Sequence, residues 1–153
     1  MPSLHVPRIR RTIFAVTALV LLLASAIVPA QQSERFGLYE VHYNTLNTNM
    51  LTPEIAQVYG IQRAGTRALL NVTVIHRDGN RPVPAEVSAR ATNLTGQQRT
   101  IELRQIRDED AVYQLGTFRV RNEEMLTFLV EVQPEGRVGP PFTFSFRKQF
   151  FTD

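Results

Sequence analysis

Residues 66–79 read TRALLNVTVIHRDG, and this stretch decides the fold. Successive side chains of a strand point to opposite faces, so every second residue shares a face. One face is wholly apolar: Ala68, Leu70, Val72 and Val74. The β-branched content favours a strand over a helix, and Asp78-Gly79 is typical of a turn. The stretch therefore predicts a central strand that lays its apolar face on the core.

The same alternation recurs in six further stretches. They span residues 35–44, 84–93, 100–107, 111–120, 125–133 and 142–151. Seven alternating strands within about 100 residues indicate an all-β fold, an immunoglobulin-like antiparallel β-sandwich of about seven strands. A small barrel is the alternative. The pattern also predicts a bulge near Gln105 and a change of phase at Gly116.

One short helix is predicted after the first strand. Thr52 suits its N-cap, Pro53 its first position and Gly60 its end. A helix this short is not stable alone. We expect it to pack on the sheet through an apolar stripe formed by Ile55, Val58 and Tyr59.

The beginning of the chain has the composition of a secretory signal peptide. Three arginines and no acid precede an apolar run over residues 13–28, and small residues follow it. That run is shorter than the roughly 20 residues of a spanning helix. We predict Sec-type export to the periplasm, cleavage between Ala30 and Gln31 with Ala26 as the alternative site, and no stable membrane anchor afterwards.

Removal of residues 1–30 changes the charge balance. The chain has 17 Lys and Arg against 14 Asp and Glu, but Arg8, Arg10 and Arg11 leave with the leader. Residues 31–153 are then formally neutral, which argues against binding to nucleic acid. The chain has no cysteine, so residues 31–153 are expected to fold as a single β-sandwich domain without disulfides.

His42 and His76 are the two histidines that remain after cleavage. Without cysteine or clustered methionine, two histidines on separate strands fall short of a metal-ligand set. No serine lies in a G-x-S-x-G context and no glycine-rich phosphate loop is present. The sequence therefore predicts no catalytic residue, no metal and no cofactor, and a protein that is not an enzyme. The alternative is a metal-binding protein or small enzyme that uses these histidines and nearby carboxylates.

Two surfaces are candidates for binding. Residues 45–65 depart furthest from plain strand connections, and long loops on a rigid scaffold often carry binding. The candidate interaction residues there are Asn47, Met50, Leu51, Gln57 and Tyr59. The last strand, residues 142–151, holds five phenylalanines. At a sheet edge it would offer its backbone to a partner strand, and core packing is the alternative interpretation.

Several stretches resemble a known family. They are FGLYEVHYNTLNTNMLTPEIAQVYGI, LLNVTVI, ATNLTGQ, RDEDAVYQLGTF and the Phe-rich end. Together they are similar to small exported proteins of gammaproteobacteria known as domain of unknown function 4426. The resemblance implies a periplasmic, single-domain β protein and brings no catalytic residues. We therefore expect a non-enzymatic periplasmic module that binds a protein or an envelope component whose identity is unknown.

Overall fold

The structure is a computed structural model that describes residues 32–152. Within this range the chain forms ten strands, a short 3₁₀ helix and one α-helix. In chain order these are β1 (Gln32–Phe36), β2 (Tyr39–Asn47), η1 (Thr48–Met50), α2 (Pro53–Val58), β3 (Arg67–His76), β4 (Arg81–Val83), β5 (Ala85–Asn93), β6 (Gln98–Ile101), β7 (Arg104–Asp108), β8 (Ala111–Arg119), β9 (Glu124–Pro134) and β10 (Phe142–Phe150). The predicted signal peptide and its cleavage between Ala30 and Gln31 lie outside the described residues.

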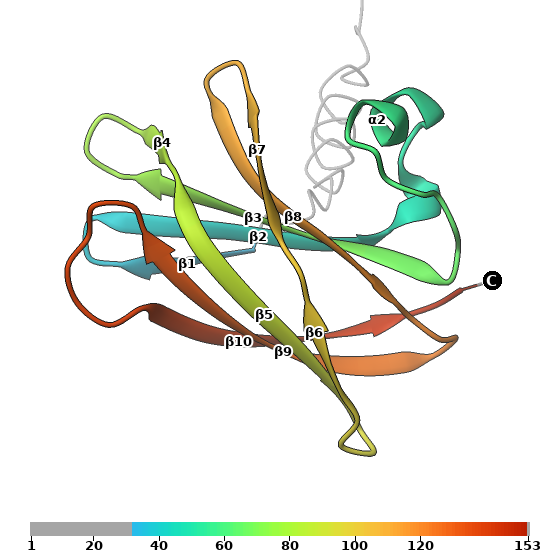
Figure 1. Cartoon of the computed structure of the whole chain (residues 1–153). Coiled ribbons are helices and arrows are strands. Elements are labelled where there is room, and N and C mark those ends of the chain that lie inside the picture. Colours follow the sequence, from blue (N-terminus) through green and yellow to red (C-terminus); the bar gives the residue numbers. More distant parts are fainter. Residues whose placement is uncertain (1–31, 153) are drawn as a thin grey trace, which may run out of the picture. The chain divides into compact units, whose positions relative to one another are not determined.

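The strands form two sheets that pack face to face (Figure 1). Sheet A has the order β1-β2-β3-β8-β7, with β4 beside one end of β3, and sheet B has the order β10-β9-β5-β6. All neighbouring strands are antiparallel. The predicted all-β antiparallel sandwich is therefore confirmed, although the described residues contain ten strands rather than about seven.

β3 is the centre of sheet A. It pairs with β2 along one side and with β8 and β4 along the other. Its predicted inner face is at most 1% exposed: Ala68, Leu70, Val72 and Val74. These residues share one apolar core with the inner face of sheet B, which includes Ala89, Ala91, Phe128, Val130 and Val132. Removing this apolar surface from water is the main driving force for joining the two sheets.

The first predicted strand, residues 35–44, is a hairpin rather than a single strand. Gly37 has a φ of +58°, and the register pairs Phe36 with Tyr39 across the turn. Two-residue turns with a positive φ match the twist of hairpin strands. One glycine between a polar stretch and an alternating one was too weak a signal to predict this turn.

The predicted strand over residues 100–107 is divided between the two sheets. β6 pairs with β5 in sheet B, whereas β7 pairs with β8 in sheet A. The predicted bulge near Gln105 is therefore wrong, because Ile106 is out of phase as a member of another sheet. The crossing passes close to Gly116, where a Cβ atom would lie 2.6 Å from the carbonyl oxygen of Glu102.

β8 buries apolar side chains on both faces. Its register with β3 is continuous through Gly116, so the predicted change of phase there is wrong. Phe118 belongs to the inner core, whereas Tyr113 and Leu115 belong to a second apolar cluster on the outer face. The two phases in the sequence reflect two buried faces of one regular strand.

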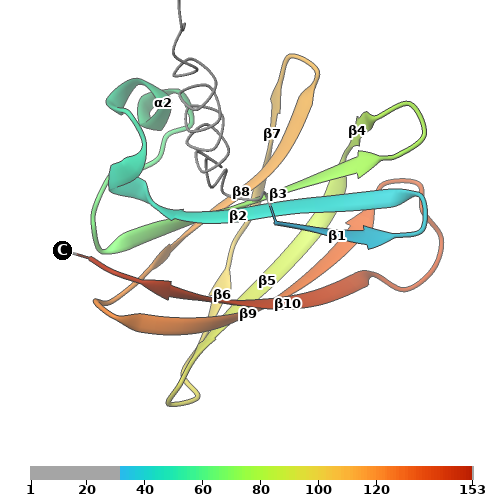
Figure 2. The same cartoon turned by 180° about the vertical axis from the view of Figure 1, so that it is seen from behind.

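β10 lies at the edge of sheet B. Phe144 and Phe146 point inward, with ring centroids 4.7 and 4.6 Å from that of Tyr43. Figure 2 shows β10 below β2, one strand in each sheet. Lys148 spans this gap, because its Nζ donates a hydrogen bond of 2.6 Å to the carbonyl oxygen of Thr45. The strand therefore both packs in the core and forms a sheet edge.

Candidate functional site

The segment between β2 and β3 carries α2 over one end of sheet A (Figure 1). The Oγ1 of Thr52 accepts a hydrogen bond of 3.3 Å from the backbone N–H of Ile55. Pro53 is the first helical residue and Gly60 has a φ of +62°. The predicted cap, first position and end are confirmed. A helix of six residues depends on packing against the sheet for its stability.

A second apolar cluster lies between α2 and the outer face of sheet A. Its buried members are Ala56, Ile61, Leu69 and Leu115, and its partly buried members are Leu51, Tyr59, Ile106 and Tyr113. β3 and β8 each contribute to this cluster with one face and to the main core with the other. The helix segment therefore hides an apolar face that an ordinary sandwich would leave polar.

An apolar pocket of about 240 Å³ opens beside this cluster. Its walls include Leu46, Leu51, Ile55, Tyr59, Leu69 and Tyr113. Asn71 also lines the pocket, and its Oδ1 is buried without a hydrogen-bond partner among residues 32–152. A buried acceptor left unpaired costs about 1–3 kcal/mol. A donor brought into the pocket would remove that cost.

Two polar contacts fix the end of α2 to β7. The Tyr59 hydroxyl donates to Oδ2 of Asp108 at 2.9 Å, and Arg104 donates to the carbonyl oxygen of Tyr59. The hydrogen bond to Asp108 raises the pKa of Tyr59, and burial adds to this shift. Because Tyr59 lines the apolar pocket, these two contacts from β7 fix that part of the pocket wall.

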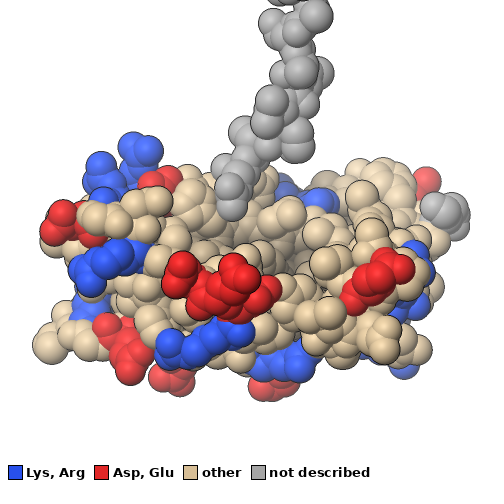
Figure 3. All heavy atoms as spheres, turned by 90° about the horizontal axis from the view of Figure 1, so that it is seen from above, with Lys and Arg blue, Asp and Glu red and all other residues tan. Residues whose placement is uncertain are grey.

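Three exposed apolar side chains lie on the segment that carries α2, and one of them, Ile55, lines the pocket. Met50 is 74% exposed, Ile55 44% and Val58 73%. Figure 3 views the molecule from above and shows acidic and basic side chains across the visible face, with uncharged residues between them. Exposed apolar side chains on a segment that borders a pocket are typical of a surface that binds a partner.

The structure divides the predicted interaction residues into three kinds. Met50 and Gln57 are exposed, and Leu51 and Tyr59 line the apolar pocket. Asn47 is committed to the fold, because its Nδ2 donates to the carbonyl oxygens of Gly65 at 2.9 Å and Phe151 at 2.7 Å.

The prediction left Val58 out of the surface, and it placed both Ile55 and Val58 in the stripe of the helix that packs on the sheet. α2 buries only Ala56 among its described residues. The signal was present in the sequence, because six helical residues form less than two turns. So short a helix has no room to bury three large apolar side chains on one side.

His42 and His76 lie on opposite faces of sheet A. His76 pairs with Tyr39 on the inner face, with ring centroids 5.1 Å apart. His42 points outward, where its Nε2 lies 3.9 Å from Oε1 of Glu40. No group of three His, Asp or Glu side chains within residues 32–152 is placed to hold a metal ion. The fold therefore does not bring the two histidines into one site.

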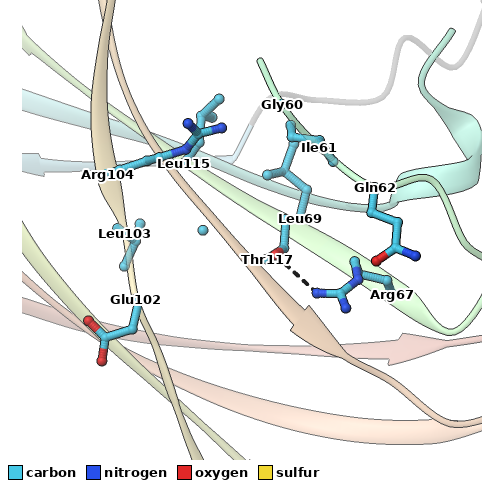
Figure 4. A pocket seen from close by; sticks show the side chains of 11 residues that line it. Gly60, Ile61, Gln62, Arg67, Leu69, Glu102, Leu103, Arg104, Leu115 and Thr117 are labelled. Carbon is cyan, nitrogen blue, oxygen red and sulfur yellow. Dashed lines mark hydrogen bonds between the residues drawn. The ribbon is translucent and has the colours of Figure 1, made fainter. Parts of the chain in front are cut away.

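A more polar pocket of about 390 Å³ shares Ile61, Leu69 and Leu115 with the apolar pocket. Figure 4 shows Arg67, Gln62 and Thr117 together on one side of it. Nη1 of Arg67 is 3.4 Å from Oγ1 of Thr117, a long hydrogen bond. Sequence reasoning did not identify this pocket, since its residues come from separate strands and one loop.

Across residues 32–152, no helix is long and apolar enough to cross a membrane. The outer face of sheet A carries the apolar and the polar pocket described above.

Solved structures show the same fold. A crystal structure of a DUF4426 family protein from Pseudomonas aeruginosa PAO1 is 36% identical, covers 80% of this chain and 96% of that chain, and has a TM-score of 0.71. A copper-bound variant of FetP from uropathogenic Escherichia coli strain F11 is 14% identical. It covers 79% of this chain and 95% of that chain, and has a TM-score of 0.59. FetP as isolated from the same strain is 14% identical, covers 79% of this chain and 93% of that chain, and has a TM-score of 0.58. At this identity FetP shares the fold alone.

No curated protein matches the chain. The family described as Domain of unknown function (DUF4426) matches residues 33–153, which include nearly all of the described residues. This match and the Pseudomonas structure agree with the resemblance read from the sequence. The chain belongs to the DUF4426 family.

Proposed function

We propose that this chain is a periplasmic, non-enzymatic module that binds an envelope protein through the outer face of sheet A beside α2. The observation that carries the proposal is the apolar pocket lined by Ile55, with Met50 and Val58 exposed on the same segment. Apolar and aromatic side chains in a partly closed pocket are typical anchors of a protein interface. The leader composition supports the proposed export.

The chemistry of the pocket favours an extended apolar segment of the partner. About 240 Å³ is below the roughly 300–1,000 Å³ of small-molecule sites, and suits an apolar side chain. The unpaired Oδ1 of Asn71 needs a donor, which the backbone N–H of an extended segment would supply. Apolar contact would then provide affinity, and this hydrogen bond would fix the orientation of the segment.

Photocrosslinking in intact cells tests the proposal. A photoreactive residue would replace Met50 or Val58, with Arg90 as the control because it is exposed on β5 of the other sheet. We expect one envelope protein to crosslink from positions 50 and 58 and not from 90. Adding Ile55→Asp, which places a charge at the pocket rim, should reduce the product. The same products from all three positions, or none from 50 and 58, would contradict the proposal.

The alternative function is a metal-binding protein or small enzyme that uses His42 and His76. The fold shared with copper-bound FetP supports it only at the level of the fold. The opposite orientation of the two side chains argues against it. We therefore retain the protein-binding function as the proposal.

A further inference from the structure

Two arginines face each other on the outer face of sheet A. The antiparallel register places Arg67 of β3 directly opposite Arg119 of β8. Both share the outward phase of Leu69 and Thr117, which are the next pair in the same register. Like charges directly opposite each other destabilise a sheet. A fold that keeps such a pair has an unfavourable interaction that a bound anion would relieve.

Neither arginine has an acidic partner within residues 32–152. The salt bridges described there involve Arg35, His42 and Arg99. Arg67 is half-buried, and within residues 32–152 its side chain makes a hydrogen bond only with Thr117, at 3.4 Å. A guanidinium that is partly removed from water without a carboxylate has lost hydration and gained little in return. Its free N–H donors therefore remain available to a ligand.

The polar pocket lies directly at Arg67. Figure 4 shows the amide of Gln62 and the hydroxyl of Thr117 beside the guanidinium, whereas Glu102 points away on the far side. Arg104 adds a second cation to the same pocket. Thr117 and Arg119 continue into a neighbouring hollow of about 590 Å³ that Arg99 and Arg121 also line. The charged side chains around Arg67 are therefore mostly cationic.

We propose that the pocket formed by Arg67, Gln62 and Thr117, together with Arg119, binds a phosphate group. A phosphate monoester carries about −1.5 to −2 charges at pH 7, which matches two arginines that are partners in the strand register. Arginine binds phosphate oxygens in a bidentate manner, and the hydroxyl and amide donate to the remaining oxygens. The site does not depend on partner binding beside α2, since its polar residues lie outside the apolar pocket.

Thermal unfolding in inorganic phosphate, against chloride at matched ionic strength, tests the site. A ligand that binds only the folded state raises the unfolding midpoint in a saturable way. We expect this rise in the wild type, and at least about tenfold weaker phosphate affinity in Arg67→Gln because a charge-assisted bidentate contact is lost. Arg90→Gln is the matched control on sheet B and should retain the wild-type response.

A second variant keeps the test decisive if Arg67→Gln fails to fold. Arg119→Gln should raise the midpoint in chloride, since it removes the like-charge pair, and should weaken the response to phosphate. A phosphate response that does not saturate and is equal in every variant would be general salt exclusion and would overturn the proposal. So would the absence of any response in the wild type.

The source of the phosphate group is resolved with vesicles. Phosphatidylcholine vesicles containing phosphatidic acid should sediment the wild type but not Arg67→Gln if the ligand is a lipid headgroup, and inorganic phosphate should release the protein. A saturable response to inorganic phosphate without sedimentation would assign the pocket to a soluble phosphate compound. Both results support the site, and they are independent of the photocrosslinking result.

Discussion

Nη2 of Arg99 lies 2.6 Å from Oε1 of Glu124, and this ion pair connects the edge strand β6 to the start of β9. The same guanidinium donates to the carbonyl oxygen of Arg119 at the end of β8. One side chain thus joins the edge of sheet B to sheet A. The side chain of Glu124 is only 7% exposed. We expect Arg99→Met to lower the free energy of unfolding by about 2 kcal/mol, measured by urea denaturation with Arg90→Met as the control.

The pH dependence of stability should report on the same pair. Burial alone would raise the pKa of Glu124, but hydrogen bonds from Arg99 and from the backbone N–H of Arg121 outweigh it, so the pKa is lowered. A carboxyl group with a lowered folded-state pKa contributes stability above its unfolded pKa, here about 4.5. That contribution is lost as the pH falls through the folded pKa. Urea midpoints of Glu124→Gln should fall less steeply with acidification than those of the wild type, and equal slopes would contradict this assignment.

Asn71→Leu should stabilise the protein and weaken partner binding. Replacing the amide removes a buried, unpaired acceptor from the pocket wall and adds an apolar side chain of similar size. We expect the free energy of unfolding to rise by about 1 kcal/mol, measured in urea. The photocrosslink from Met50 should decrease at the same time if Oδ1 of Asn71 accepts a hydrogen bond from the partner. An unchanged crosslink in the stabilised variant would place the partner elsewhere.

Lys148→Val should promote self-association. Lys148 shares the inward phase of the phenylalanines on the edge strand β10, and burial lowers its pKa. Charged residues that point inward are a means of protecting an edge strand from pairing with another chain. Light scattering after size exclusion should show dimers or larger species for Lys148→Val at concentrations where Lys148→Arg remains monomeric. A monomeric Lys148→Val protein would show that β10 is protected by other means.

Copper titration separates the retained proposal from its alternative. Since His42 and His76 lie on opposite faces of sheet A, we expect His42→Ala and His76→Ala each to leave any copper affinity within about twofold of the wild type. Competition with a chromophoric chelator measures this affinity. A large loss in both single variants would show that one ion contacts both histidines, in conflict with the fold.

The sequence alone was sufficient to predict the sandwich, the central strand and the caps of the helix. Each depends on a local pattern: alternation at Ala68 to Val74, and cap-forming residues at Thr52 and Gly60. It was insufficient at residues 100–107, where local alternation does not reveal that the chain changes sheets. The same limit applies to β8. A strand that changes phase at Gly116 and a regular strand that is buried on both faces have the same sequence pattern.

The candidate site was predicted only in part. The segment beside α2 was identified from its length and its unusual composition, whereas Asn47 was chosen as a surface residue although it binds the backbone at Gly65. The pairing of Arg67 with Arg119 depends on the register of two strands about fifty residues apart. No local pattern carries that information.

The second apolar cluster has a spectroscopic consequence. The chain has four tyrosines and no tryptophan, and the fold divides the tyrosines into two pairs. Tyr39 and Tyr43 pack with the inner core, whereas Tyr59 and Tyr113 line the pocket under α2. A molecule that enters this pocket alters the surroundings of the outer pair alone. Tyrosine fluorescence therefore reports, without an added label, whether the pocket is occupied.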